Sequence, residues 1–258
     1  MSFYDLSKED RIILVLKIKQ ELFKDIKNNN LDAFIKYFSD EDTYIRKSAY
    51  QAIGKIYFSE EKYKKTLIQL LFGLLKHPND KIRQTTVNAA GEIGIKEFEL
   101  TEYFFDHALF DKHHSVRNAV IGSMKKMGEK NPKPIINWAK KYLHHEDKEI
   151  RREICHGIEL RGRTHPQDIL PLLQALENDK SARVRNTLIH VLGQIAYKKG
   201  CLEIVLSELN KWTNIPLIKA ALEEIIDVHF RYRNFSFYTQ AEAKAKIHEL
   251  MPSKVRES

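Results

Sequence analysis

The sequence predicts an all-α solenoid, a single elongated domain in which helical hairpins stack side by side. The 258 residues include only ten glycines and seven prolines, too few for the many tight turns of an all-β fold. The hydrophobic share of 43% is enough to bury a continuous core. The strongest observation is an internal repeat of about 34 residues, which is typical of stacked repeats.

The repeat is an apolar residue followed by a basic one, at nearly constant spacing. Successive copies lie 37, 34, 34, 34 and 34 residues apart. They are Ile45-Arg46, Ile82-Arg83, Val116-Arg117, Ile150-Arg151, Val184-Arg185 and Ile218-Lys219. Gly94, Gly128 and Gly162 each follow the apolar residue by 12 positions, and Pro132 and Pro166 each follow it by 16. Several positions in one phase indicate a structural unit rather than a chance motif.

Each unit is predicted to be a helix–turn–helix. The apolar positions of one second helix follow a single helix face; they are Val184, Leu188, Val191, Leu192 and Ile195. First helices are expected at 66–76, 134–143, 168–176 and 202–211. We expect the in-phase glycines to end the second helices in left-handed C-caps, and the prolines to prevent continuation.

Capping helices are expected at both ends of the array. Ser7 followed by Asp10 is a capping-box variant that opens a helix over 7–27, and 241–250 is predicted to be the last helix. The expected organisation is one domain over 1–258, with an N-terminal cap (1–30), about six repeats (31–231) and a C-terminal cap and tail (232–258).

The charge of the chain favours an anionic partner. Forty-three Lys and Arg against 35 Asp and Glu leave a formal net charge of +8. Cys155 and Cys201 are too far apart in a chain of this length to indicate a disulfide framework, so we expect a reducing compartment. Neither a signal peptide nor an apolar run of about 18 residues is found, so the sequence predicts a cytoplasmic protein without membrane contact.

Parts of the chain resemble known families. Asp-Lys-Ile-Arg at 80–83 and Ala-Arg-Val-Arg at 182–185 open segments that resemble the second helices of HEAT repeats. From Phe110 to about Ile226 the chain resembles the DNA alkylation repair superfamily, which includes AlkD-type and AlkC-type alkylpurine DNA glycosylases. The motifs are Ser115-Val116-Arg117-Asn118-Ala119-Val120, Lys-Asn-Pro at 130–132 with Trp138, and Arg-Gly-Arg-Thr-His-Pro at 161–166.

The resemblance implies DNA binding more strongly than base excision. In that family the second helices grip the DNA backbone, and an aromatic–acid pair and an arginine act at the lesion. Arg152 falls where the family arginine would be, and His190 stands at another aromatic position. The place of the aromatic–acid pair is taken by other residues, namely His113, His114, Val116 and Arg117. Asp147, Glu149 and Glu153 are the nearest acids.

The basic residues of the second helices allow two interpretations. The repeated Arg could pair with turn acids as a structural ladder; the candidate partners are Asp42, Asn79, Asp111, Asp147 and Asp179. Alternatively, a basic stripe could contact DNA phosphates. The predicted DNA-binding residues are Arg117, Arg151, Arg152, Arg161, Arg163, Arg183, Arg185, Lys125 and Lys126.

The leading hypothesis is therefore a HEAT-repeat protein that binds duplex or branched DNA. The alternatives are an alkylpurine DNA glycosylase, which leaves enzymatic activity open, and a scaffold for an acidic protein partner. No metal site is predicted, because the His113-His114, His144-His145 and Cys155-His156 pairs fit no standard ligand spacing. No catalytic residue or small-molecule cofactor is predicted either, because the sequence has no Walker loop, Ser-His-Asp order, Cys–His nucleophile motif or dinucleotide fingerprint.

Overall fold

The protein is all helical in the computed structural model, which describes residues 3–252 and residue 254. Over that part of the chain no strand is found, and the predicted all-α solenoid of helical hairpins is confirmed. The helices form two compact units, one of residues up to Met127 and one of residues from Gly128 on. The single domain expected over 1–258 remains a prediction, and the tail after Pro252 lies largely outside the described residues.

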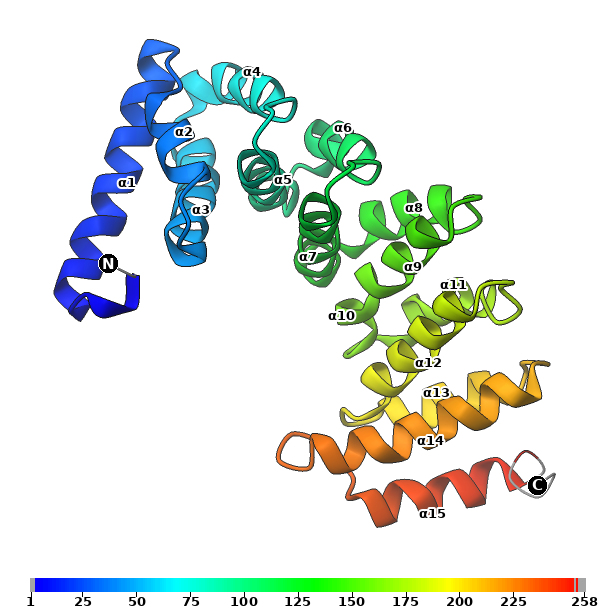
Figure 1. Ribbon diagram of the computed structural model, residues 1–258. Helices are drawn as coiled ribbons and strands as arrows, with labels where there is room; N and C mark the ends of the chain where they lie inside the picture. The colour runs from blue at the N-terminus through cyan, green and yellow to red at the C-terminus, as the bar shows by residue number, and fades with distance from the viewer. Residues whose placement is uncertain (1–2, 253, 255–258) are drawn as a thin grey trace. The chain divides into compact units, whose positions relative to one another are not determined.

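The first unit contains an N-terminal helix followed by helical hairpins (Figure 1). Its elements are η1 (Phe3–Asp5), α1 (Lys8–Asn28), α2 (Asp32–Phe38), α3 (Thr43–Ser59), η2 (Glu61–Tyr63), α4 (Lys64–Leu74), α5 (Asp80–Gly94), α6 (Phe98–Ala108) and α7 (His114–Lys130), whose last residues belong to the second unit.

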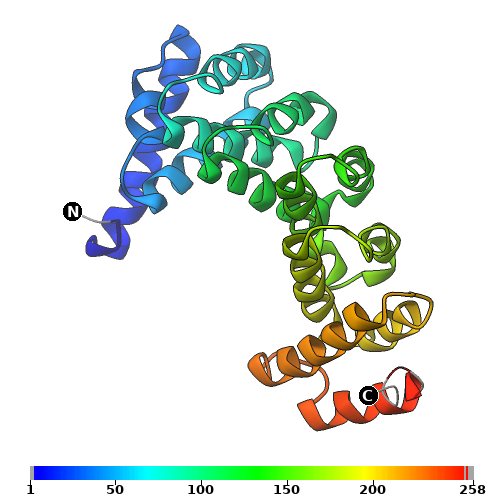
Figure 2. The same ribbon diagram turned by 45° about the vertical axis from the view of Figure 1, so that its right-hand side comes forward.

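The second unit continues the hairpin pattern (Figure 2). Its elements are α8 (Pro132–Tyr142), α9 (Lys148–Gly157), α10 (Glu159–Gly162), η3 (Pro166–Asp168), α11 (Leu170–Gln174), α12 (Ala182–Ala196), α13 (Cys201–Leu209), α14 (Ile215–Arg231) and α15 (Gln240–Leu250).

Within the second unit, the second helices of the hairpins pack against one another, α9 on α12 and α12 on α14. We call these helices, together with the short α10, the second-helix layer. The predicted apolar stripe of α12, from Val184 to Ile195, is fully buried. This burial explains the repeat, because one hairpin cannot cover its apolar face without its neighbours.

The predicted helix starts at the two ends are confirmed. The Ser7 hydroxyl accepts a hydrogen bond from the Asp10 amide at 3.1 Å and caps α1. At the other end, Thr239 and Glu242 form a complete capping box at the start of α15. Both ends therefore satisfy backbone donors that no preceding turn could satisfy.

The in-phase glycines do not form the predicted left-handed C-caps, although two of them end helices. Gly94 and Gly162 are the last residues of α5 and α10, and Gly128 lies inside α7. Among the described glycines only Gly200 has a positive φ. A Cβ on Gly162 would lie 2.3 Å from Ile169 Cδ1, so close packing rather than a left-handed turn requires glycine there.

Cys155 and Cys201 are both buried free thiols. None of the described helices combines the length and the apolar character needed to cross a membrane.

Candidate functional site

A pocket of about 470 Å³ opens on the second-helix layer of the second unit, between α9 and α12. Asp147 begins α9 by accepting the Glu149 amide at 2.8 Å, while Ile150 and Ile154 anchor the buried face of the helix. On each helix the lining residues recur at steps of three or four positions, so they share its accessible face. They are Arg152, His156, Arg183, Asn186, Thr187 and His190.

The two arginines of the pocket differ in how firmly they are held. Arg152 Nε lies 3.0 Å from Glu149 Oε2, and its Nη2 lies 3.5 Å from an oxygen of the buried Glu153. Arg183 Nη1 lies 3.2 Å from the other oxygen of Glu149, but 64% of the Arg183 side chain is exposed. Arg183 is therefore the more accessible cation, whereas the carboxylates of Glu149 and Glu153 orient Arg152.

Each of the two histidines contacts a carboxylate, His156 within its own hairpin and His190 from the next one. His156 Nε2 lies 3.1 Å from Glu159 Oε2, and His190 Nδ1 lies 3.6 Å from Glu224 Oε1. The two imidazole rings face each other edge to face, with centroids 5.9 Å apart. The Glu159 side chain is only 1% exposed, and its other oxygen accepts Arg163 Nη2 at 2.5 Å. A buried carboxylate thus lies beside two imidazoles at the edge of the pocket.

The repeated arginines form a structural ladder. In each case Nη1 donates to the carbonyl oxygen six residues earlier, at 2.5 to 2.9 Å; the pairs are Arg46–Asp40, Arg83–His77, Arg117–Asp111, Arg151–His145 and Arg185–Asp179. These bonds satisfy carbonyls of the turn between the two helices.

Two rungs also hold an aspartate of the next turn. Arg83 Nε and Nη2 donate to Asp111 at 2.7 and 2.9 Å, and the same atoms of Arg151 donate to Asp179 at 2.6 and 2.9 Å. The bidentate hydrogen bond from Arg151 lowers the pKa of Asp179 below its ordinary value. The guanidinium donors of Arg83 and Arg151 are therefore engaged within the fold.

The pocket contains two of the nine predicted DNA-binding residues, Arg152 and Arg183. Arg161 pairs with Asp168 at 2.6 Å, and Arg163 is held by Glu159 and by Gln194 Oε1 at 2.9 Å. Arg117, Arg151 and Arg185 belong to the ladder. Lys125 and Lys126 lie in the first unit, where Lys126 pairs with Glu92 at 2.5 Å.

The positions that correspond to the aromatic–acid pair hold no acid. His113 Nδ1 lies 3.3 Å from Asp80 and 2.7 Å from Ser115 Oγ, while Arg117 binds the Asp111 carbonyl. Asp147, one of the acids near Arg152, is engaged as the N-cap of α9. The surroundings of these residues are those of turns and helix caps.

The sequence analysis missed His156, Asn186 and Thr187 as members of one pocket. The repeat period could have identified them, because His156 and His190 are 34 residues apart, as are Arg152 and Asn186. Equivalent positions of adjacent repeats lie side by side when hairpins stack.

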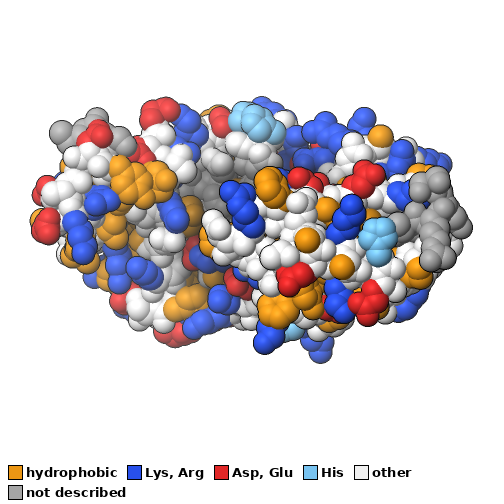
Figure 3. Space-filling view, turned by 90° about the horizontal axis from the view of Figure 1, so that it is seen from below, with side chains coloured by type: hydrophobic (Ala, Val, Ile, Leu, Met, Phe, Trp, Pro, Cys, Tyr) orange, Lys and Arg blue, Asp and Glu red, His pale blue; other side chains and the backbone are white. Residues whose placement is uncertain are grey.

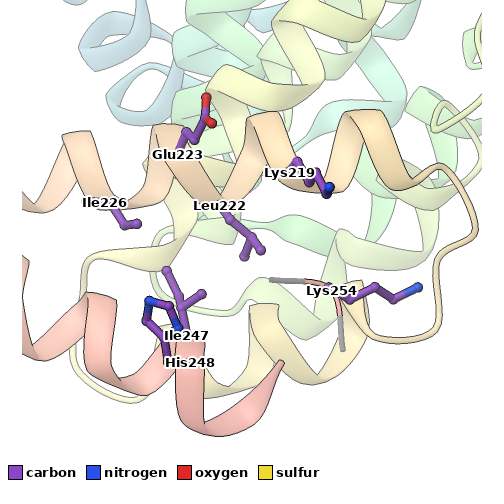
Figure 4. A pocket seen from close by; sticks show the side chains of 7 residues that line it. All are labelled: Lys219, Leu222, Glu223, Ile226, Ile247, His248 and Lys254. Carbon is purple, nitrogen blue, oxygen red and sulfur yellow. The ribbon is translucent and has the colours of Figure 1, made fainter. Parts of the chain in front are cut away.

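A second, more apolar pocket of about 190 Å³ lies between α14 and α15 (Figure 4). Leu222 and Ile226 of α14 and Ile247 of α15 form its apolar lining. Its polar lining consists of Lys219, Glu223, His248 and Lys254. Such a pocket has the size and chemistry to take one apolar side chain.

Taken together, these features define a HEAT-type protein, in which stacked hairpins present a layer of second helices with a polar pocket on it. Residues 13–158, more than half of the chain, match the family model of the sister chromatid cohesion protein PDS5, and residues 136–223 match the model of HEAT repeats. The chain therefore belongs to the HEAT-repeat family that the PDS5 model describes, and the predicted HEAT repeats are confirmed.

Solved structures show the same fold. AlkD2 from Streptococcus mutans is similar over 79% of this chain and 97% of its own, with 18% identity and a TM-score of 0.55. The N-terminal domain of MAST/Orbit is similar over 78% of this chain and 98% of its own, with 19% identity and a TM-score of 0.52. No curated protein matches the chain in sequence.

Proposed function

We propose that the protein binds DNA through the second-helix layer of its second unit, with Arg152 and Arg183 contacting backbone phosphates. The observation that carries this proposal is the composition of the pocket between α9 and α12. Two arginines, two histidines, an asparagine and a threonine line it, and no carboxylate is among them. Arginine, asparagine, threonine and histidine side chains can all donate hydrogen bonds to phosphate oxygens.

The net charge of +8 supports an anionic ligand, but it does not identify the surface that binds this ligand. On the face shown in Figure 3, acidic side chains lie among the basic ones. Many basic side chains form ion pairs with acidic ones, as in Lys126–Glu92 and Arg161–Asp168. Binding would therefore depend on exposed donors such as Arg183 rather than on a uniformly basic face.

The residues that line the pocket support DNA binding alone better than they support base excision. Excision of a cationic alkylated purine requires an acid and an aromatic ring that face the base, as the resemblance to the alkylation repair superfamily implies. The six lining residues include neither a carboxylate nor a Phe, Tyr or Trp side chain. Arg152 is the family feature that the pocket retains, and it supports contact with DNA.

The test compares Arg183→Ala with Lys211→Ala. Both side chains are 64% exposed and each is paired with one glutamate, but only Arg183 lines the pocket. Loss of one phosphate contact should lower the affinity for a short duplex about fivefold, from ~1 kcal/mol, and reduce the salt slope by about one. Lys211→Ala should change neither quantity.

Fluorescence anisotropy over a salt series, in buffer with EDTA, measures both quantities. The proposal fails if the wild-type protein does not bind duplex DNA at low salt, or if the two variants weaken binding equally. In that case the apolar pocket between α14 and α15, with its two lysines, would favour the alternative of a scaffold for an acidic protein partner.

A further inference from the structure

Three side chains at the edge of the pocket have the composition of a metal site. One ligand atom each of His156, Glu159 and His190 lies within 4.8 Å of the ligand atoms of the other two. They come from α9, α10 and α12, so only the stacking of two hairpins brings them together. We propose that these residues bind one divalent transition-metal ion.

The spacing is close to what such an ion requires. Nitrogen and oxygen ligands bind Zn²⁺ at about 2.0 to 2.2 Å, so two ligand atoms in a tetrahedral site lie about 3.4 Å apart. His156 Nε2 and Glu159 Oε2 are 3.1 Å apart. The ligand atom of His190 lies at most 4.8 Å from the other two ligand atoms, so it would have to move closer by about 1.4 Å at most to reach the tetrahedral ligand–ligand distance. Its side chain is 43% exposed, so a change of side-chain torsion can supply this movement.

Neighbouring groups hold the ligands in orientations suited to a metal. Arg163 donates to Glu159 Oε1 and so directs the other oxygen, Oε2, toward His156. Gln194, one turn after His190 on α12, accepts a second bond from the same Arg163 nitrogen. The ligand carboxylate is therefore fixed at one oxygen and faces the histidines with the other.

His190 has a carboxylate partner near its Nδ1 atom. Its Nδ1 lies 3.6 Å from Glu224 Oε1, which is itself held by Arg231 Nη2 at 2.5 Å. A carboxylate at Nδ1 favours the tautomer in which Nε2 carries the lone pair, which is the arrangement that metal-binding histidines usually show. Glu224 is thus a positioning residue for His190.

The donor set indicates the class of ion. Two imidazoles and one carboxylate suit zinc and other late first-row ions, whereas calcium and magnesium require mostly oxygen ligands. Three protein ligands leave at least one coordination position for water or a ligand. Because His156 and His190 both line the pocket, an ion can enter from solvent. The inference does not depend on DNA binding.

The experiment is calorimetric titration of the chelator-stripped full chain with Zn²⁺. The wild-type protein should bind one ion per chain, and His190→Ala should lower the affinity roughly tenfold or more. His165→Ala, which changes an exposed histidine of the same unit outside the cluster, should leave the affinity unchanged. Glu224→Gln should weaken Zn²⁺ binding while the melting temperature of the metal-free protein stays the same.

Titration with Co²⁺ provides a second readout. A site with three protein ligands should give the intense visible absorption of four- or five-coordinate Co²⁺, and this absorption should disappear in His190→Ala. Absence of stoichiometric Zn²⁺ binding, equal affinity in His190→Ala, or only the weak absorption of six-coordinate Co²⁺ would each overturn the proposal. The cluster would then be an ion-pair network that orders Glu159.

Discussion

Replacing Arg151 with alanine should destabilise the protein much more than replacing Arg185, although both occupy the same position of the repeat. Each donates to the carbonyl six residues earlier. Arg151 also donates to the Glu146 carbonyl at 2.8 Å and holds Asp179 with two bonds. The pair is nearly buried, with exposed side-chain fractions of 14% for Arg151 and 5% for Asp179.

The expected magnitudes follow from these contacts. Removing one partner of a buried ion pair costs about 3 to 5 kcal/mol. Asp179 keeps its bond from the Ser181 amide at 2.8 Å, so the lower end, about 3 kcal/mol, applies to Arg151→Ala. Arg185→Ala removes one hydrogen bond to a carbonyl and should cost about 1 kcal/mol.

Urea unfolding followed by far-UV circular dichroism at neutral pH measures the free energy of unfolding of the two variants and of the wild-type protein. The pKa of Asp179 is lowered in the folded state, so its contribution is present above about pH 4 and is lost as the pH falls through the folded pKa. The difference in free energy of unfolding between wild type and Arg151→Ala should therefore become smaller below about pH 4. Equal costs for the two variants, or a gap that is constant with pH, would refute the ladder argument.

Three further outcomes are expected. Gly162→Ala should lower the free energy of unfolding in urea by about 1 to 3 kcal/mol, because the new Cβ would lie 2.3 Å from Ile169 Cδ1 and 2.7 Å from Ile195 Cγ2. Gly128→Ala should be neutral or stabilising, because the nearest atom to its Cβ would lie at 3.6 Å. Equal effects of the two substitutions would contradict the packing explanation. Burial lowers the pKa of His229, so stability should fall as the pH drops below about 6.5, and His229→Gln should flatten the dependence of melting temperature on pH between 7 and 5; an unchanged slope would exclude His229 as its source. Release of 7-methylguanine from alkylated DNA should stay at background, and robust release would restore the glycosylase alternative.

The fold was predictable because its signal is repeated. Each second helix needs an apolar residue to bury and a basic residue to bind the turn, so Ile150-Arg151 and its equivalents recur at a fixed step. The glycine prediction failed because the repeated glycine marks a place where helices approach closely, as at Gly162. Sequence spacing alone does not distinguish such contact from a left-handed turn.

The site was less predictable, since it depends on which side chains pair. Arg161 and Arg163 look as available as Arg183 in the sequence, yet Asp168 and Glu159 engage them in the fold. These partners are set by side-chain torsions and by the short α10, which the repeat pattern does not specify. The contact of His156 with Glu159 likewise depends on where α9 ends and α10 begins.

The two aspartate rungs have a consequence for how the array unfolds. The step of 28 residues that leads from Arg83 to Asp111 leads from Arg185 to Thr213, which cannot accept a bidentate ion pair. Neighbouring hairpins are therefore coupled unevenly, and repeat arrays unfold at their weakest interfaces. In native-state hydrogen exchange, amides of hairpins joined by an aspartate rung should open together, whereas amides of hairpins without such a rung should open separately.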